Sequence, residues 1–445
     1  MKNATIIGSG LIGSLLSIYL SKRGFNVDLF ERRPDMRTNR ISAGRSINLA
    51  LSDRGWRGLE GVGIADEIRK VAIPMKARIV HNPDGTLSRL PYGKDDQAIY
   101  SVSRGGLNCV LMDLAEKSGA KIHFNQKCAH VDLAQGVATF EHATTKAISH
   151  STSQPIFSTD GAFSAGRLQM QLSTDRFNYQ ISYLEYGYKE LCIPADKHGD
   201  FAMDPTGLHI WPRGNFMLIA LPNMDKSFTC TLFFPFEGET SFAALSTPDK
   251  VMAFFKETFT DTIALMPTLL EDFQTNPASS LGTVKCFPWS FNDKMVLLGD
   301  AAHAVVPFYG QGMNCGFEDC VTLDALIGEH GEDWSKVFKL FERSRKPNAD
   351  AIADLAVANF VEMRDKVTDP AFLLQKKIEG HFAGKHPDKW IPLYTMVTFS
   401  PDLPYATALR EGKKQDEIMA KILKMEGIAD KWDSPEVEKA ILALL

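Results

Sequence analysis

The chain has 445 residues, of which 44% are hydrophobic and 23% charged, and its formal net charge at pH 7 is −5. This composition is typical of a globular protein of two or three domains, and the absence of a basic run argues against nucleic-acid binding. The seven cysteines are scattered and His303 has no partners at metal-ligand spacing, so neither disulfides nor a metal site are predicted. We expect a cytoplasmic protein, since no signal peptide and no membrane span are evident.

The N-terminal residues predict a βαβ dinucleotide-binding unit. Its strand, glycine-rich turn, helix and second strand are expected at 4–7, 8–13, 15–22 and 26–30. Gly8 would permit the tight turn, Gly10 would let a pyrophosphate approach the backbone, and Gly13 would let the helix pack closely. Glu31 stands where a carboxylate binds an adenosine ribose, which favours FAD or NAD over NADP. The alternative interpretation is a glycine-rich turn that binds no ligand.

A second glycine-rich segment runs from Leu298 to Cys320. The apolar run before it predicts a buried strand that ends at Gly299 and Asp300, and a helical pattern begins near Met313. A strand, a glycine-rich turn and a helix start together direct backbone N–H groups at an electron-rich ligand. Asp300 would accept hydrogen bonds from sugar or ribitol hydroxyls, or it caps the turn.

Three arginines between these segments are candidate ligand-binding residues. Arg45 lies in a loop that lines a flavin edge or is simply solvated and basic. Arg78 lies in an apolar strand at 75–81 that pairs with a strand near Tyr92, either on the solvated face or at a substrate. Arg104 stands at the start of a helix, where a guanidinium can reach a phosphate.

The middle of the chain predicts a separate sheet. Residues 179–236 are rich in strands, with long apolar strands at 216–221 and 227–234. Helical patterns return at Val251 and again after Met313. This block interrupts the dinucleotide-binding domain, so we expect it to form a sheet over the cofactor.

Three sites along the chain are the fingerprint with Glu31, the segment with Asp160 and Arg167, and the pair Gly299-Asp300. Together they resemble the single-component flavin-dependent aromatic hydroxylases, up to about residue 330. The chain is most similar to the kynurenine 3-monooxygenase family, in the ordered segments ERRPD (31–35), GRSINLALSDRG (44–55), Pro91-Tyr92-Gly93, GYKEL (187–191), LHIWPRG (208–214), VPFYGQGMNC (306–315), NFVEM (359–363) and PLYTMVTFS (392–400).

The predicted elements and the resemblance imply an α/β fold. A Rossmann-like FAD-binding domain would be interleaved with a β-sheet substrate domain and followed by a helical C-terminal region. The expected ranges are 1–70, 100–175 and 280–330 for the FAD-binding domain, 71–99 and 176–279 for the sheet domain, and 331–445 for the helical region. Eukaryotic members of the family end in a membrane anchor, whereas the amphipathic end of this chain predicts a soluble protein with no membrane partner.

The resemblance also implies a substrate site. In that family an arginine, two tyrosines and an asparagine hold the amino-acid end of kynurenine, and the matching residues here are Arg78, Tyr92, Asn359 and Tyr394. A guanidinium pairs bidentately with a carboxylate, and phenol and amide groups add oriented donors. The other residues expected at the substrate are Pro307, Phe308, Tyr309, Glu362 and Met363. Bacterial members can carry histidine at the position of Tyr309, so the resemblance assigns that side chain no specific role.

The cofactor residues implied by the fingerprint and the resemblance come from all three sites. They are Gly8, Gly10, Leu11, Ile12, Gly13, Glu31, Arg32, Arg45, Arg104, Asp160, Asp300, Gly312, Met313 and Asn314. Around Asp160 the chain departs from the family, with Ser158 and Thr159 in place of Gly-Ala and Gly166 in place of valine. We expect tightly bound FAD, with backbone N–H groups at 312–314 stabilising negative charge on the flavin.

The resemblance implies hydroxylation of L-kynurenine to 3-hydroxy-L-kynurenine through a flavin C4a-hydroperoxide, with NADPH as transient reductant. Expected partners are a small aromatic amino acid and O2, in a monomer or homodimer. No side chain is expected to act as acid, base or metal ligand, and His303 is interpreted as a structural turn residue. Two alternatives stay open: a hydroxylase of the same fold that acts on another aromatic acid, and a non-enzymatic flavin- or NAD-binding redox sensor.

Overall fold

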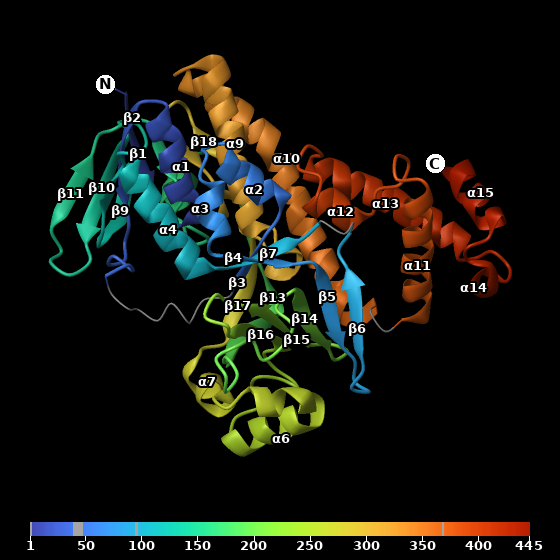
Figure 1. Cartoon of the computed structure of the whole chain (residues 1–445). Helices are drawn as coiled ribbons and strands as arrows, with labels where there is room; N and C mark the ends of the chain where they lie inside the picture. The colour runs from blue at the N-terminus through green and yellow to red at the C-terminus, as the bar shows by residue number, and fades with distance from the viewer. Residues whose placement is uncertain (1, 39–47, 94–96, 367–368) are drawn as a thin grey trace.

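The computed structural model describes residues 2–38, 48–93, 97–366 and 369–445. One sheet has the strand order β18–β19–β12–β1–β2–β8 and is parallel except for β18 (Figure 1). Its strands are β18 (Ser290–Phe291), β19 (Met295–Leu297), β12 (Ile156–Ser158), β1 (Lys2–Ile7), β2 (Phe25–Phe30) and β8 (Lys121–His123). The N-terminal strand β1 thus lies between β2, the next strand along the chain, and β12, which is more than a hundred residues away in the sequence.

The glycine fingerprint joins β1 to helix α1 (Leu11–Lys22), which starts directly after the turn and four residues earlier than predicted. Gly8 has a φ of +97°, a backbone conformation that side chains other than hydrogen disfavour. A Cβ on Gly13 would lie 2.0 Å from the Gly8 carbonyl oxygen, so only glycine allows the helix to approach this closely. The helices α4 (Arg104–Lys117) and α9 (Gly312–His330) pack against α1.

A second, seven-stranded sheet lies beside the first, and one of its faces is covered by helices α6 (Pro248–Thr258) and α7 (Leu269–Thr275), at the bottom of Figure 1. Its order is β17 (Ser279–Phe287), β13 (Asn178–Ile193), β16 (Phe228–Pro235), β15 (Met217–Pro222), β14 (Gly207–Pro212), β5 (Ala77–His81) and β6 (Leu87–Pro91). Apolar residues such as Trp211, Leu218 and Phe234 are fully buried between this face and the helices.

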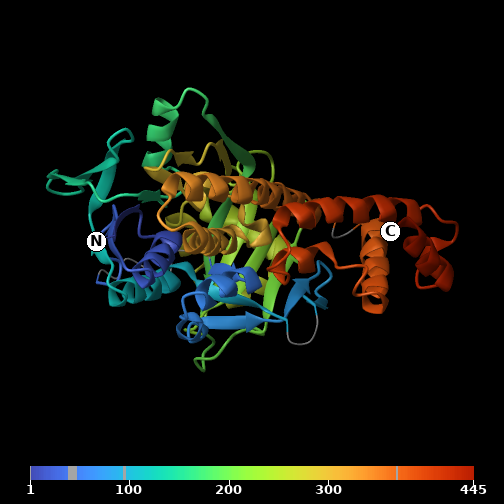
Figure 2. The ribbon, with the colours of Figure 1, turned by 90° about the horizontal axis from the view of Figure 1, so that it is seen from above.

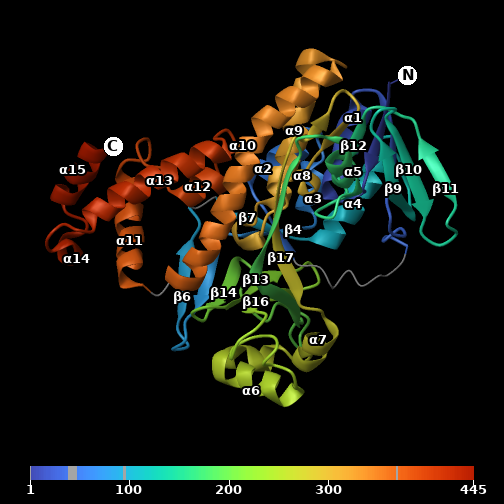
Figure 3. The ribbon, with the colours of Figure 1, turned by 180° about the vertical axis from the view of Figure 1, so that it is seen from behind.

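The longest strand, β13, has 16 residues and pairs with two partners (Figure 3). Its N-terminal part runs antiparallel to β17, and its C-terminal part runs antiparallel to β16. The register with β17 shifts between Tyr183 and Gly187. The two strands therefore form a continuous ribbon that extends out of the seven-stranded sheet.

Two three-stranded sheets complete the β-structure, with the orders β3 (Asn48–Leu51), β7 (Ile99–Ser103), β4 (Ala72–Met75) and β11 (Ile148–Ser151), β10 (Val137–His142), β9 (Gln126–Asp132). The hairpin expected from a strand at 75–81 and one near Tyr92 is present as β5 and β6, which pair antiparallel from Ala77 with Pro91 to His81 with Leu87. Its first strand starts at Ala77 and not at Met75, because the chain changes sheets at Lys76 and Met75 ends β4. The sheet at 126–151 was not predicted, because its strands are short and mostly solvated on one face.

Helices dominate the rest of the structure, and the C-terminal ones project to one side of the molecule (Figure 2). The remaining helical elements are α2 (Asp53–Glu60), α3 (Ala65–Arg69), α5 (Ala165–Ser173), η1 (Thr260–Leu265), α8 (Asp300–His303), η2 (Pro307–Tyr309), α10 (Trp334–Val361), the π-helix η3 (Glu362–Lys366), α11 (Pro370–Lys385), α12 (Leu393–Thr398), α13 (Tyr405–Ile422), α14 (Ile428–Lys431) and α15 (Pro435–Leu444). Within the described residues, none of the helices combines the length and apolar character that crossing a bilayer requires.

Candidate active site

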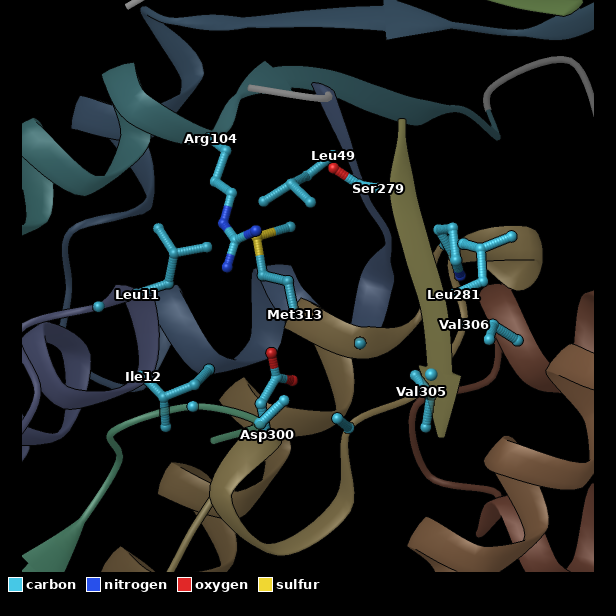
Figure 4. A pocket seen from close by; sticks show the side chains of 18 of the residues that line it. Leu11, Ile12, Leu49, Arg104, Ser279, Leu281, Asp300, Val305, Val306 and Met313 are labelled. Atoms are coloured by element: carbon cyan, nitrogen blue, oxygen red, sulfur yellow. The ribbon is translucent and has the colours of Figure 1, made fainter. Parts of the chain in front are cut away.

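A cavity of about 960 Å³ extends from the glycine fingerprint to Arg78 on β5. Both large sheets contribute to its wall, together with the segment between α8 and α9. Figure 4 shows Leu11 and Ile12 at one side, and Val305 and Val306 at another. The cavity therefore has room for two ligands side by side, one at the fingerprint and a second at the Arg78 end.

The fingerprint end of the cavity has the features of a dinucleotide site. Gly10 lines the cavity, and a Cβ at this position would meet no atom within 4 Å, so the backbone is open to a ligand. The Glu31 carboxylate also lines the cavity and accepts hydrogen bonds from the backbone N–H groups of Ser9 and Arg33, both at 3.0 Å. These bonds hold Glu31 at the carboxyl end of β2, where the ribose of an adenosine would lie. The predicted residues Gly8, Leu11, Ile12 and Arg32 line the same region.

Charged groups approach the middle of the cavity from opposite sides (Figure 4). Arg104 extends into it from the start of α4, beside Met313, and Asp300 extends into it from the first turn of α8. Gly312 at the start of α9 lines the wall between them. This arrangement offers a cation, a carboxylate and the N-terminal N–H groups of α9 to one bound molecule.

Three of the predicted cofactor residues have other structural contacts. The buried Asn314 side chain donates to the carbonyl oxygens of Ala50 and Gly310, so only its backbone is free for a ligand. Asp160 lines the cavity, but its carboxylate accepts from the backbone N–H of Ala165 at 2.6 Å and caps α5. Gly13 packs against Gly8 and does not line the cavity. Arg45 lies outside the described residues.

The far end of the cavity is built around Arg78. Its guanidinium carbon lies 4.7 Å from the ring centre of Tyr394 on α12 and 5.5 Å from that of Tyr92. The Tyr394 ring stacks between Tyr92 and Tyr309, with centroid distances of 5.4 and 5.7 Å. Two tyrosine rings from separate segments, Tyr92 and Tyr394, are therefore within cation–π distance of one guanidinium, and Tyr309 stacks behind Tyr394.

Two buried polar atoms at this end, Arg78 Nε and the Tyr92 hydroxyl, make no hydrogen bond of ordinary geometry to the described residues, although the two side chains lie close enough to interact electrostatically. Buried polar groups in proteins are nearly always satisfied, and an unsatisfied one costs about 1–3 kcal/mol. Burial raises the pKa of Tyr92, Tyr309 and Tyr394 above that of a free phenol, so all three hydroxyls stay protonated at neutral pH. The site thus holds one cation and several O–H donors for an incoming acceptor.

The other predicted substrate residues divide into two groups. Pro307, Phe308 and Met363 line the cavity next to Tyr309. Asn359 and Glu362 do not line it, and the Asn359 amide donates to the Phe308 carbonyl oxygen at 2.7 Å. Asn359 therefore fixes the Phe308 loop in this structure.

Several cavity residues were missed by the sequence analysis. They alternate along the strands of the seven-stranded sheet: Leu208 on β14, Met217, Ile219 and Leu221 on β15, and Thr231 and Phe233 on β16. The period of two shows which residues share a face. It does not show which of two equally apolar faces looks onto a ligand, because the other face packs against α6 and α7.

His303 has neighbours that the sequence analysis did not find. Its Nε2 lies 2.6 Å from Asp319 Oδ2, and Cys315 Sγ lies 3.9 Å from its Nδ1. The Asp319 carboxylate also accepts from the Gly299 N–H at 2.9 Å and from Arg345 Nε at 2.7 Å. Although burial alone opposes the charge, Asp319 raises the pKa of His303 well above its usual value. His303 thus belongs to a buried ion-pair network whose members lie 12 and 16 residues away in the sequence, a spacing that the sequence analysis did not associate with it. Both oxygens of Asp319 already accept hydrogen bonds from the protein.

Known proteins match this chain over most or all of its length. A family model described as an FAD binding domain matches residues 1–356. A kynurenine 3-monooxygenase from Flavobacterium johnsoniae is 51% identical over 99% of this chain and 98% of its own, and one from Dictyostelium discoideum is 46% identical over 95% and 93%. The solved structure of 2-methyl-3-hydroxypyridine-5-carboxylic acid oxygenase aligns with a TM-score of 0.67 at 20% identity, over 84% of this chain and 95% of that one.

These matches confirm the α/β fold predicted from the sequence and the binding of FAD. They leave no place for the interpretation of the chain as a non-enzymatic redox sensor. The relatives align with nearly the whole chain, and the family model matches residues 1–356 of it. The chain belongs to the kynurenine 3-monooxygenase family of FAD-dependent aromatic monooxygenases.

Proposed function

We propose that this protein hydroxylates L-kynurenine to 3-hydroxy-L-kynurenine, with NADPH as transient reductant and O2 as co-substrate, through a flavin C4a-hydroperoxide. The names of the relatives support this substrate. The bound FAD would supply the redox and oxygen chemistry, and the chain would supply binding, orientation and a dry site.

The observation that carries the proposal is the unpaired end of the cavity. Arg78 Nε and the Tyr92 hydroxyl are buried without partners among the described residues. A carboxylate has two oxygens that accept two donors each, and a guanidinium matches it bidentately. The carboxylate of an α-amino acid would satisfy both groups, with Tyr394 as a further donor beside them.

The walls between this end and the fingerprint suit an aromatic ring. The ring centres of Phe308 and Phe233 lie 4.8 Å apart, and both residues line the cavity together with Met217 and Pro307. Such apolar walls exclude water, which protects a reactive oxygen donor from side reactions. The backbone N–H groups at 312–314 would stabilise negative charge on the flavin ring, and Arg104 and Glu31 would hold the pyrophosphate and ribose.

This proposal also assigns the domains. Residues 1–70, 100–175 and 280–330 would form the FAD-binding domain, and 71–99 and 176–279 the substrate domain. The helical region, 331–445, would contribute Tyr394 and Met363 to the substrate site. A cytoplasmic location remains a prediction.

The test is NADPH oxidation by the purified holoenzyme in air, with and without L-kynurenine, and the product identified by mass. We expect stimulated oxidation and a product that is one oxygen atom heavier. The analogue of kynurenine without the carboxylate is the matched control, and its KM should be much higher because Arg78 would then stay unpaired. Stimulation by a hydroxybenzoate or salicylate but not by kynurenine would replace this function with that of a related aromatic-acid hydroxylase.

A further inference from the structure

Arg54, on α2, is buried at 1% exposure and has an unusually complete set of partners. Its guanidinium lies 3.9 Å from the ring centre of Tyr405. Its acceptors are Glu318 Oε1 at 2.8 Å from Nη1, the carbonyl oxygen of Val397 at 2.7 Å from Nε, and those of Met396 and Ser400, each at 3.1 Å from Nη2, and of Leu403. Nε and Nη1 each donate to one acceptor and the two N–H groups of Nη2 share three, so all three nitrogens of the guanidinium are bonded to the segment at 396–403 or to α9.

The carbonyl groups that Arg54 holds belong to the end of α12 and the turn after it. The same short helix carries Tyr394 in its first turn, stacked between Tyr92 and Tyr309 and beside Arg78. A helix of six residues has few internal hydrogen bonds to fix its place. The position of Tyr394 therefore depends on what holds the carbonyl end of α12, and Arg54 holds it.

The other partners of Arg54 lead towards the cofactor end. Glu318 on α9 also pairs with Arg345, and Arg345 in turn pairs with Asp319. The Tyr405 hydroxyl donates to Gln311 Oε1 at 2.9 Å, directly before the first residue of α9. Arg54 is thus bonded on one side to the helix of Tyr394 and on the other to the helix whose N-terminal end borders the proposed flavin site.

We propose that Arg54 is a positioning residue for the hydroxylation: it fixes Tyr394 at the substrate relative to α9 at the flavin. This inference rests on the proposed function, because Tyr394 has a role only if an amino-acid substrate binds beside Arg78. Arginine is required because its planar fork presents donors in fixed directions to five acceptors. The lysine ammonium is compact and has three donors, so it can keep the charge beside Glu318 but not the carbonyl contacts.

The first experiment compares wild-type holoenzyme with Arg54→Lys. We measure FAD content and melting temperature, the Kd of L-kynurenine by flavin absorbance, kcat, KM, and the fraction of oxidised NADPH that yields hydroxylated product. We expect FAD to be retained and the Kd to rise about tenfold, equivalent to about 1.4 kcal/mol. The product fraction should also fall, since a misplaced substrate lets reduced flavin react without hydroxylating it.

A double-mutant cycle separates positioning of Tyr394 from general loosening of the fold. In a Tyr394→Phe background, Arg54→Lys should change the Kd by less than about twofold, because the hydroxyl that Arg54 places is already absent. The matched control is Arg57→Lys. Arg57 lies on the same helix and donates to the Pro401 carbonyl oxygen of the same turn at 2.9 Å, but from the exposed side, so its replacement should leave Kd and product fraction unchanged.

An equal change of Kd in both backgrounds, or no change in either, overturns the positioning role while wild-type turnover of kynurenine leaves the proposed function intact. Absence of kynurenine binding and turnover in the wild type would instead refute the proposed function itself, and this inference with it. If Arg54→Lys does not retain FAD, Glu318→Gln replaces it. That variant weakens the hydrogen bond from Arg54 Nη1 and keeps the guanidinium itself. We expect it to raise the Kd of L-kynurenine less than Arg54→Lys does, and this rise must again disappear in the Tyr394→Phe background.

Discussion

Arg54 and Arg78 are both stacked on tyrosine rings, yet their polar surroundings are opposite. Arg54 donates to five acceptors of the protein, whereas Arg78 Nε, with the Tyr92 hydroxyl beside it, has no partner among the described residues. A satisfied buried cation ties elements of the fold together, and an unsatisfied one is held ready for a ligand. The difference is the reason why we propose the Arg78 end of the cavity, and not the surroundings of Arg54, as the place where a substrate binds.

The largest effect should come from disrupting the buried ion pairs that Arg345 makes with Glu318 and Asp319. Arg345→Met leaves the Asp319 and Glu318 carboxylates without a shared cation, and we expect the free energy of unfolding to fall by about 3–5 kcal/mol. Urea unfolding of the FAD-bound protein measures it. Arg343→Met, at an exposed position of the same helix, is the control and should be nearly neutral. Equal stability of the two variants would show that the network contributes little.

Replacing Arg78, whose Nε has no hydrogen-bond partner among the described residues, should affect the binding of kynurenine and not the stability of the fold. We expect Arg78→Ala to raise the KM for L-kynurenine by the equivalent of about 2–4 kcal/mol of lost carboxylate pairing, with FAD content unchanged. Steady-state kinetics of NADPH oxidation measures it. Arg89→Ala is the matched control, because Arg89 lies on the adjacent β6 but pairs with Asp204 at the surface. Wild-type kinetics in Arg78→Ala would remove Arg78 from the substrate site.

The stability that the buried Asp319 contributes through His303 and Arg345 should also depend on pH. Although burial alone opposes the charge, His303 and Arg345 hold the pKa of Asp319 at about 2, against an ordinary value of 3.8. Because the folded pKa is the lower one, this stabilisation is complete above the ordinary pKa and is lost as the pH falls through about 2. We therefore expect the stability difference between wild type and Asp319→Asn to shrink by about 2 kcal/mol as the pH is lowered from about 4 to about 2, as measured by urea unfolding. A pH-independent difference would contradict a charged Asp319.

The smallest effect should come from Tyr92→Phe, and its two parts should have opposite signs. The variant removes a buried hydroxyl that has no partner without substrate, so its melting temperature should be equal to or slightly above that of wild type. The Kd of L-kynurenine should rise by the equivalent of about 0.5–1.5 kcal/mol, since one donor to the substrate is lost. A lower melting temperature with unchanged Kd would place this hydroxyl among the structural groups instead.

The sequence was most informative where function depends on local backbone geometry. The strand, the glycine turn and the helix of the fingerprint occupy adjacent residues, so spacing alone predicts them, and Glu31 lies at the strand end as expected. The family resemblance predicted that Arg78, Tyr92 and Tyr394 belong to one site, although Tyr394 is far from the other two in the sequence. Their distances and their unpaired atoms required the structure.

The contacts of buried polar groups could not be predicted, because they join distant parts of the chain. Arg54 is 343 residues from Val397, and no local period relates the two. The same reason explains why Asn359 was expected at the substrate although its amide holds the Phe308 carbonyl. Sequence periodicity indicates that a residue is buried, but the identity of its partner is decided by how the helices and sheets pack.

The ribbon of β13 and β17 has a mechanical consequence. Its antiparallel hydrogen bonds hold the two strands in register, so the strands cannot slide past each other without breaking the ladder. The register shift between Tyr183 and Gly187 interrupts this ladder. Because Tyr183 also borders the cavity, a bend at this interruption would widen or narrow the cavity without moving the fingerprint.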